Sequence, residues 1–100
     1  MKIEVIAASK ASYLLIKYKM IMKIKEVEIK VKKVVANVLE MDESEIADDA
    51  NFIFDLGADS MQSMLLIGGF EEEFDIEMDV EKAQEVQTID GAVEFISKYL

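Results

Sequence analysis

The apolar pattern of residues 24–39 constrains the fold of this chain more than any other feature. Its aliphatic side chains recur at helical spacing, with charged residues largely on the opposite side. These aliphatic residues are Ile24, Val27, Val31, Val34, Val35 and Val38. Residues 27–31 also alternate as a strand would, and valine is a mediocre helix former. Because the helical period continues through Leu39, the pattern favours an amphipathic helix of about 15 residues.

A long acidic connection is predicted over residues 40–58. Unstructured loops of this length are uncommon in small domains and often have a function. Short apolar anchors interrupt its acids, and we expect the aromatic ones to hold the loop across the core. These residues are Ile46, Phe52, Phe54 and Leu56. Gly57 stands where the loop ends, so we expect it to adopt a positive φ angle.

A second helix is predicted to begin at Asp59 and Ser60, both good N-cap residues, and to end near Phe74. Its interior contains Gly68 and Gly69, each of which costs about 1 kcal/mol relative to alanine. Three interpretations of these glycines are open. They widen the space for a bulky ligand, or they let a partner approach the backbone closely. Otherwise they produce a kink or are simply tolerated. The expected buried stripe of this helix comprises Leu66, Ile67, Phe70 and Phe74.

Two shorter elements complete the predicted fold. One segment begins at Asp79 or Val80 and ends near Val86, and Thr88 then caps a last helix. The expected inner face of that helix comprises Ile89, Ala92, Val93, Ile96 and Leu100. The fold class is therefore all-α, a bundle of three or four amphipathic helices joined by short connections.

The composition excludes most kinds of catalysis. The chain of 100 residues contains no histidine, cysteine, arginine, proline or tryptophan. Without histidine and cysteine, the usual nucleophile–base pairs and the common zinc sites cannot be assembled. An acidic, metal-dependent hydrolase is the remaining enzymatic alternative, and a small helical domain offers little cleft for one. We therefore expect a protein that is not an enzyme and has no resident metal.

Charge divides the chain into two parts. Residues 1–39 have a net charge of +6, and residues 40–100 have a net charge of −16. The acidic part repels nucleic acid phosphates and attracts basic protein surfaces. No apolar run approaches the roughly 20 residues needed to span a bilayer. Residues 1–9 make a poor signal peptide because Glu4 interrupts their short apolar stretch. We expect a cytoplasmic monomer without a nucleic acid partner or stable membrane insertion.

The length predicts one domain, over residues 23–100, preceded by an extension of uncertain order over residues 1–22. Three interpretations of the extension compete. The first is that the extension is an artefact of an upstream start codon, with the natural start at Met20 or Met22. The second is that it is a basic segment that touches a membrane or a partner. The third is that it folds back on the acidic body. We favour a dispensable tail, because the domain is complete without it and chain termini are commonly disordered.

The chemistry is concentrated in residues 55–60, with the sequence Asp-Leu-Gly-Ala-Asp-Ser. Taken alone, Asp-Ser before a helix is more often a simple cap. The longer pattern adds Phe52, the Glu-Glu-Glu-Phe of residues 71–74, and Thr-Ile-x-x-Ala-Val-x-Phe-Ile over residues 88–96. Together these stretches resemble the acyl carrier protein family. The resemblance covers roughly residues 25–98, and the string of residues 55–60 is highly specific.

This resemblance implies a four-helix fold and a 4′-phosphopantetheine arm transferred from coenzyme A to Ser60. The thiol of the arm holds acyl groups as thioesters and supplies the sulfur that the chain lacks. Asp59 matches the family residue that helps to position a magnesium ion during the transfer. The implied partners are a phosphopantetheinyl transferase and acyl-transferring, condensing or synthetase enzymes with basic docking surfaces.

The sequence departs from the family just after the serine. Met61 fits the usual apolar position, but Gln62 and Leu65 stand where the family has acids. These departures argue against general fatty-acid synthesis and suggest a dedicated partner. The alternative is drift that Glu71 and Glu72 compensate. We expect the partner-binding face to comprise Met61, Gln62, Leu65, Gly68, Glu71 and Glu72.

The leading hypothesis is a carrier of acyl intermediates in fatty-acid synthesis or in a specialised lipid or polyketide-type pathway. One alternative is a peptidyl or aminoacyl carrier of nonribosomal peptide synthesis, which is also modified on serine. Another is an unmodified helical adaptor that keeps the fold without the arm. The string of residues 55–60 and the strong acidity favour the acyl type, and the presence of Asp59 and Ser60 argues against the adaptor.

Overall fold

The computed structural model describes the backbone of residues 2–100 and the side-chain surroundings of residues 10–100. Met1 and the side chains of residues 2–9 lie outside the described part. The signal-peptide prediction, which concerns residues 1–9, therefore lies outside it as well. Four α-helices and a short 3₁₀ helix make up the described chain, and no strand occurs in it. They are α1 (Lys2–Leu39), η1 (Glu43–Glu45), α2 (Ser60–Phe74), α3 (Val80–Gln84) and α4 (Ile89–Ser97). The predicted all-α fold is confirmed.

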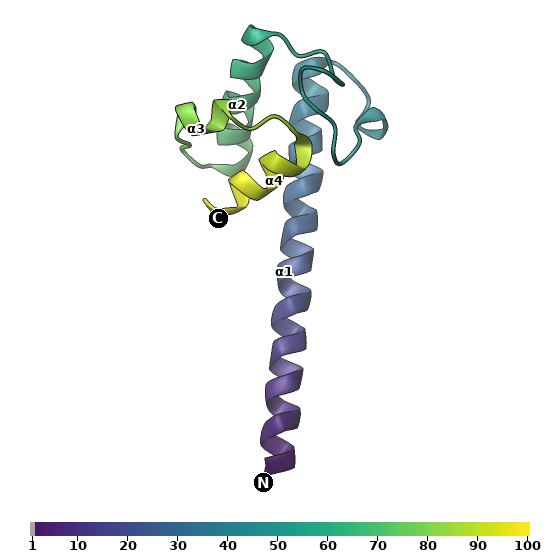
Figure 1. Cartoon of the computed structure of the whole chain (residues 1–100), viewed down its shortest axis with the longest axis vertical. Coiled ribbons are helices and arrows are strands. Elements are labelled where there is room, and N and C mark those ends of the chain that lie inside the picture. Colours follow the sequence, from purple (N-terminus) through teal and green to yellow (C-terminus); the bar gives the residue numbers. More distant parts are fainter. Residues whose placement is uncertain (1) are drawn as a thin grey trace.

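The core lies where the C-terminal part of α1 packs against α2 and α4, as Figure 1 shows. Within α1, the aliphatic stripe at Val27, Val31, Val34 and Val35 is buried, which confirms most of the predicted apolar face. Within α2, Leu66, Ile67 and Phe70 are buried, while Phe74 is only partly covered. The residues that α4 contributes to the core are Ile89, Ala92, Val93 and Ile96.

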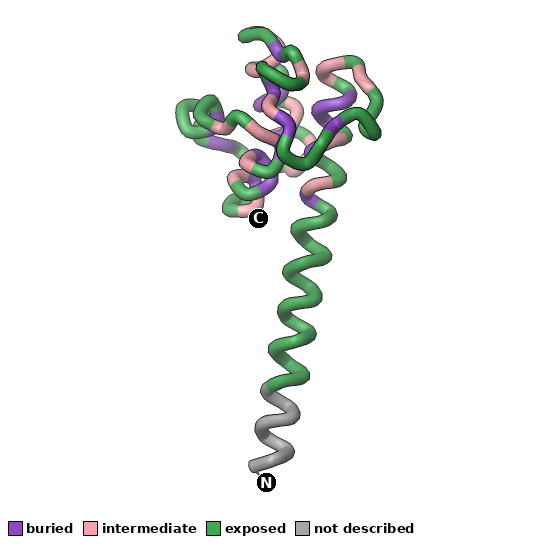
Figure 2. Tube along the Cα trace, turned by 45° about the vertical axis from the view of Figure 1, so that its right-hand side comes forward, coloured by how far each residue is buried: buried purple, intermediate pink, exposed green. Residues whose placement is uncertain are grey.

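The first helix extends well beyond the prediction. α1 begins at Lys2, and every described residue between Lys10 and Glu26 is exposed, so this part projects from the body (Figure 2). The predicted burial of Ile24 is wrong, since 48% of this residue is exposed. Among the residues of α1 whose burial is described, Val27 is the first buried one, so the cover given by the body does not extend as far as Ile24. The alternative in which the extension folds back on the body is also wrong for residues 10–22.

Two further burial predictions are wrong. Phe54 does not hold the loop, because 87% of it is exposed, whereas Phe52 and Ile46 are buried as expected. The loop turns sharply after Asn51, and only one of the two aromatic side chains can then face the core. Leu100 is also exposed, because α4 ends at Ser97 and the last residues no longer follow its inner face.

The predicted turn at Gly57 and the predicted starts of α3 and α4 agree with the structure. Gly57 has a φ of 75°, a left-handed conformation that glycine adopts without steric cost. Asp79 caps α3 and Thr88 caps α4, each by accepting a backbone N–H with its side chain. Among the described helices, none combines the length and the apolarity needed to cross a membrane.

Candidate functional site

The loop that precedes α2 is fixed by its own polar groups. The side-chain Oδ1 of Asn51 accepts the backbone N–H groups of residues 53 and 54, each at 3.0 Å. The Asp55 carboxylate in turn accepts the Asn51 N–H at 2.7 Å. The backbone N–H of Phe52 donates to the carbonyl of Gln87 at 2.9 Å, which ties the loop to the segment before α4. These bonds hold the loop in one shape without burying it.

Each residue between Asp55 and the helix has a structural role. Leu56 is half-buried against the core, and Gly57 supplies the positive φ angle that reverses the chain. Ala58 is buried, and its N–H donates to the Phe52 carbonyl at 2.8 Å. A larger residue at Ala58 would have to displace core side chains. The string of residues 55–60 therefore serves to present the start of α2 at a fixed place.

The start of α2 is a reciprocal capping box. Asp59 Oδ1 accepts the Gln62 N–H at 2.8 Å, and Gln62 Oε1 accepts the Asp59 N–H at 3.0 Å. The sequence analysis assigned Gln62 to the partner-binding face alone and missed this bond. The spacing Asp-x-x-Gln is the signal that would have revealed it.

Ser60 is the first residue of α2 and is exposed. Among the described residues its hydroxyl has no hydrogen-bond partner, whereas the Ser63 hydroxyl donates to the Asp59 carbonyl at 2.9 Å. The unpaired N–H groups at a helix start favour an anion such as a phosphate ester. A group attached through a phosphate to Ser60 would therefore lie at the favourable end of α2.

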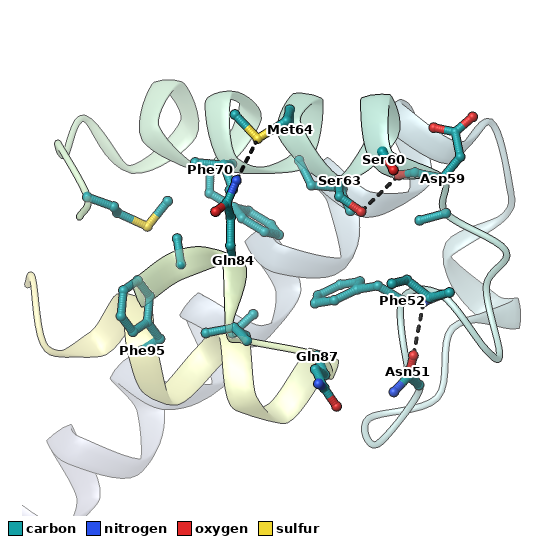
Figure 3. A pocket seen from close by; sticks show the side chains of 18 of the residues that line it. Asn51, Phe52, Asp59, Ser60, Ser63, Met64, Phe70, Gln84, Gln87 and Phe95 are labelled. Carbon is teal, nitrogen blue, oxygen red and sulfur yellow. Dashed lines mark hydrogen bonds between the residues drawn. The ribbon is translucent and has the colours of Figure 1, made fainter. Parts of the chain in front are cut away.

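A cavity of about 730 Å³ opens beside Ser60, between α2, α3, α4 and the loop. Figure 3 shows Asp59, Ser60 and Ser63 at the end near Phe52, and Phe95 at the opposite end. The Gln84 side-chain amide donates to Met64 Sδ at 3.3 Å across the cavity (Figure 3). Its apolar lining includes Phe52, Leu66, Ile67, Phe70, Met78, Ala83, Ala92 and Ile96. The size is typical of pockets for small organic ligands. The sequence analysis did not place this cavity.

The two glycines of α2 have different surroundings. A Cβ added at Gly69 would lie 2.8 Å from Val34 Cγ1, so this glycine lets α2 approach α1 closely. A Cβ at Gly68 would meet no atom within 4 Å. Neither glycine lines the cavity, and the idea that they widen it for a ligand is therefore wrong.

The six predicted partner-binding residues do not form one uniform face. Met61, Leu65, Gly68 and Glu72 are exposed along α2. Gln62 belongs to the capping box, and Glu71 is half-buried and accepts the Met78 N–H at 2.9 Å. The exposed row is therefore apolar near Ser60 and becomes acidic beyond Gly68.

Comparison with known proteins identifies the class of this site and then the family. Residues 30–96 match the protein family described as "Phosphopantetheine attachment site". The class is thus a phosphopantetheine-bearing carrier domain.

The relatives include acyl carrier proteins of Buchnera aphidicola from Acyrthosiphon pisum. Those of strains Tuc7 and APS are 42% identical to this chain over 74 residues, which cover 74% of the chain and 92% of each relative. That of strain 5A is 42% identical over 72 residues, with 72% and 90% covered. The chain belongs to the acyl carrier protein family, whose members are carriers and not enzymes.

Proposed function

We propose that Ser60 is the attachment point of the 4′-phosphopantetheine arm and that the chain carries acyl groups on it. The observation that carries this proposal is the exposed Ser60 hydroxyl, without a partner among the described residues, at the mouth of an apolar cavity. When bound, the arm supplies the thiol that this cysteine-free chain lacks. The adjacent cavity offers an apolar surface on which an acyl chain can lie.

Asp59 supports the attachment from the neighbouring position. Its Oδ1 is used in the capping box, while its Oδ2 accepts no hydrogen bond from the described residues. That oxygen is therefore the part of the chain that fits a magnesium ion held by the transferase, because magnesium prefers carboxylate oxygens together with phosphate oxygens. The same side chain keeps Ser60 at the helix start.

We further propose that the partner enzymes dock on the exposed row of α2 and that they are dedicated to a specialised pathway. Residues 61–68 of this row carry no charge, and the acids begin at Glu71 and Glu72. Along a helix, the distance from Met61 to Glu72 is about 16 Å. A partner that fits this row has an apolar surface beside Ser60 and its basic surface further along α2. Enzymes of general fatty-acid synthesis, whose basic surfaces meet acids close to the serine, should dock less well.

The replacement Leu65→Glu tests this docking proposal by restoring one of the missing acids. We expect it to speed malonyl loading by a malonyl transferase of bacterial fatty-acid synthesis, because complementary charge mainly raises the association rate. The matched control is Ile29→Glu, which introduces the same charge at an exposed aliphatic residue of α1 (Leu65 is 55% and Ile29 is 64% exposed). Equal loading rates for all three chains would mean that Leu65 does not determine docking.

The cargo is tested by intact-mass analysis of the chain after expression with its neighbouring biosynthetic enzymes. The proposal predicts a chain that bears one arm with an acyl group on it. An arm loaded with an amino acid would instead identify a carrier of nonribosomal peptide synthesis. A chain that never acquires an arm would support the unmodified adaptor.

A further inference from the structure

The projecting part of α1 exposes an unusual amount of apolar surface. We call residues 10–25, which Figure 2 colours as exposed, the arm helix. Nine of its large apolar side chains are each at least 41% exposed. They are Tyr13, Leu14, Leu15, Ile16, Tyr18, Met20, Ile21, Met22 and Ile24. Isolated exposed apolar residues are ordinary, but nine of them within sixteen residues of one helix mark an interaction surface.

The charged residues of the arm helix all have the same sign. It contains five lysines and no acid, whereas residues 40–100 have a net charge of −16. The five lysines are Lys10, Lys17, Lys19, Lys23 and Lys25. An occupant that covers the arm helix should therefore combine apolar surface with carboxylates.

A groove with that chemistry lies on the body, at the place where α1 leaves it. This groove between α1 and α4, of about 450 Å³, is separate from the cavity beside Ser60. Its apolar floor comprises Ile24, Ile89 and Val93. Its rim comprises Glu28, Asp48, Asp90 and Glu94, with Lys98 as the one basic residue among those that line it. We call it the acidic groove.

Apart from Ile24 at its end, the arm helix cannot reach the acidic groove of its own chain. α1 is a continuous helix from Lys2 to Leu39, and the groove opens on its side at Ile24 and Glu28. A helix without a break cannot fold back on its own side, so the arm helix that fits this groove must come from another molecule.

We propose that two copies of this chain form an antiparallel dimer in which each arm helix lies in the acidic groove of the other copy. The arrangement is reciprocal, as a two-fold axis requires, so the groove-facing side of each arm helix is covered in one closed assembly. Met20 and Ile24 continue the buried row of Val27 and Val31 at helical spacing, and the second copy extends the cover of that row. This dimer replaces the monomer that the sequence alone predicted.

A membrane surface fits the same observations less well. A helix that lies on a bilayer separates its lysines from its apolar residues. Here Lys10 and Lys17 lie on nearly the opposite side of the helix from Lys19 and Lys23, at 100° per residue. The strongly acidic body would also be repelled by an anionic bilayer.

Sedimentation velocity of the full chain over a range of concentrations tests the dimer. We expect the mass to rise from 11.3 kDa to twice that value and no further. Met20→Glu, on the side of α1 that faces the groove, should raise the dissociation constant by about tenfold or more. Met22→Glu, the same replacement on the opposite side, should leave it nearly unchanged. Both residues are exposed, so neither variant is expected to unfold the body.

A second pair of variants tests the acidic groove. Glu94→Lys reverses a charge on the rim and should weaken the dimer, whereas Glu72→Lys makes the same change on α2 and should not. A chain that stays monomeric at every concentration would overturn the proposal. So would open-ended association, equal effects within either pair of variants, or a monomer that binds phosphatidylglycerol vesicles. None of these outcomes depends on whether Ser60 is modified.

Discussion

The two parts of α1 have similar apolar content but opposite surroundings. Beyond Val27 the helix is covered by α2 and α4, and Val31 and Val35 are fully buried. Between Lys10 and Glu26 large apolar side chains are just as frequent, yet every residue is exposed. The difference teaches that neighbouring elements decide burial. An apolar period predicts that a helix forms, but it does not predict where its cover ends.

The largest expected effect is a difference in stability between the two parts. Val31→Ala removes two methyl groups from a fully buried position and should lower the free energy of unfolding by about 2 kcal/mol. Leu15→Ala removes more apolar surface, but from a position that is 54% exposed, and should change it by less than about 0.5 kcal/mol. Urea unfolding of both variants, at a concentration at which the chain is a monomer, measures this. Similar losses would mean that the exposed part of α1 is also packed in the monomer.

The adjacent glycines of α2 show the same contrast on a smaller scale. Gly68→Ala adds a methyl group in open space and should stabilise the chain by about 0.5–1 kcal/mol through helix propensity. Gly69→Ala gains the same propensity but forces a shift of Val34, which lies 2.8 Å from the added Cβ. We expect Gly69→Ala to be less stable than Gly68→Ala by about 1–2 kcal/mol. Thermal melting that ranks them in the reverse order would show that α1 and α2 can separate freely at this point.

The smallest expected effect is on the pH dependence of stability. It concerns the loop of residues 40–58, which α1 contacts through an ion pair. Lys32 forms an ion pair with Asp48, and the hydrogen bond from Lys32 holds the pKa of the Asp48 carboxyl below its ordinary value of 3.8. Because the pKa of Asp48 is lower in the folded state, the ion pair stabilises the fold fully above pH 3.8. This contribution is lost as the pH falls through the pKa of Asp48 in the folded state.

The replacement Asp48→Asn should therefore make stability fall less steeply below pH 3.8, and Asp49→Asn is the matched control. Urea midpoints measured near neutral pH and below 3.8 give the comparison. If Asp48→Asn follows the same pH dependence as the unchanged chain, the ion pair contributes nothing to stability. Because the Asp48 side chain is 70% exposed and Lys32 is partly exposed, the effect should also shrink as salt is added.

Much of the fold could be predicted because the local signals agree with one another. The aliphatic period after Val27, the caps at Asp59, Asp79 and Thr88, and the positive φ of Gly57 each depend on a few adjacent residues. The burial of Phe54 and Leu100 was predicted wrongly for the opposite reason. Whether an aromatic or aliphatic side chain at the end of an element faces the core depends on how the chain turns there.

The candidate site divides in the same way. Ser60 and Asp59 were predicted from the string of residues 55–60, whose roles are local. The cavity is built from α2, α3, α4 and the loop, and no sequence spacing shows that these elements enclose a space. The second role of Gln62, in the capping box, was visible in the spacing but was not considered.

The central claim is that Ser60 receives the arm, and peptide mass mapping after transfer tests it most directly. The unmodified chain is incubated with a phosphopantetheinyl transferase, coenzyme A and magnesium. We expect one phosphopantetheine group, located on Ser60. Ser60→Ala should accept none and keep its stability, since Asp59 provides the cap, while Ser63→Ala should accept one as before. A group on Ser63, or transfer to Ser60→Ala, would contradict the account.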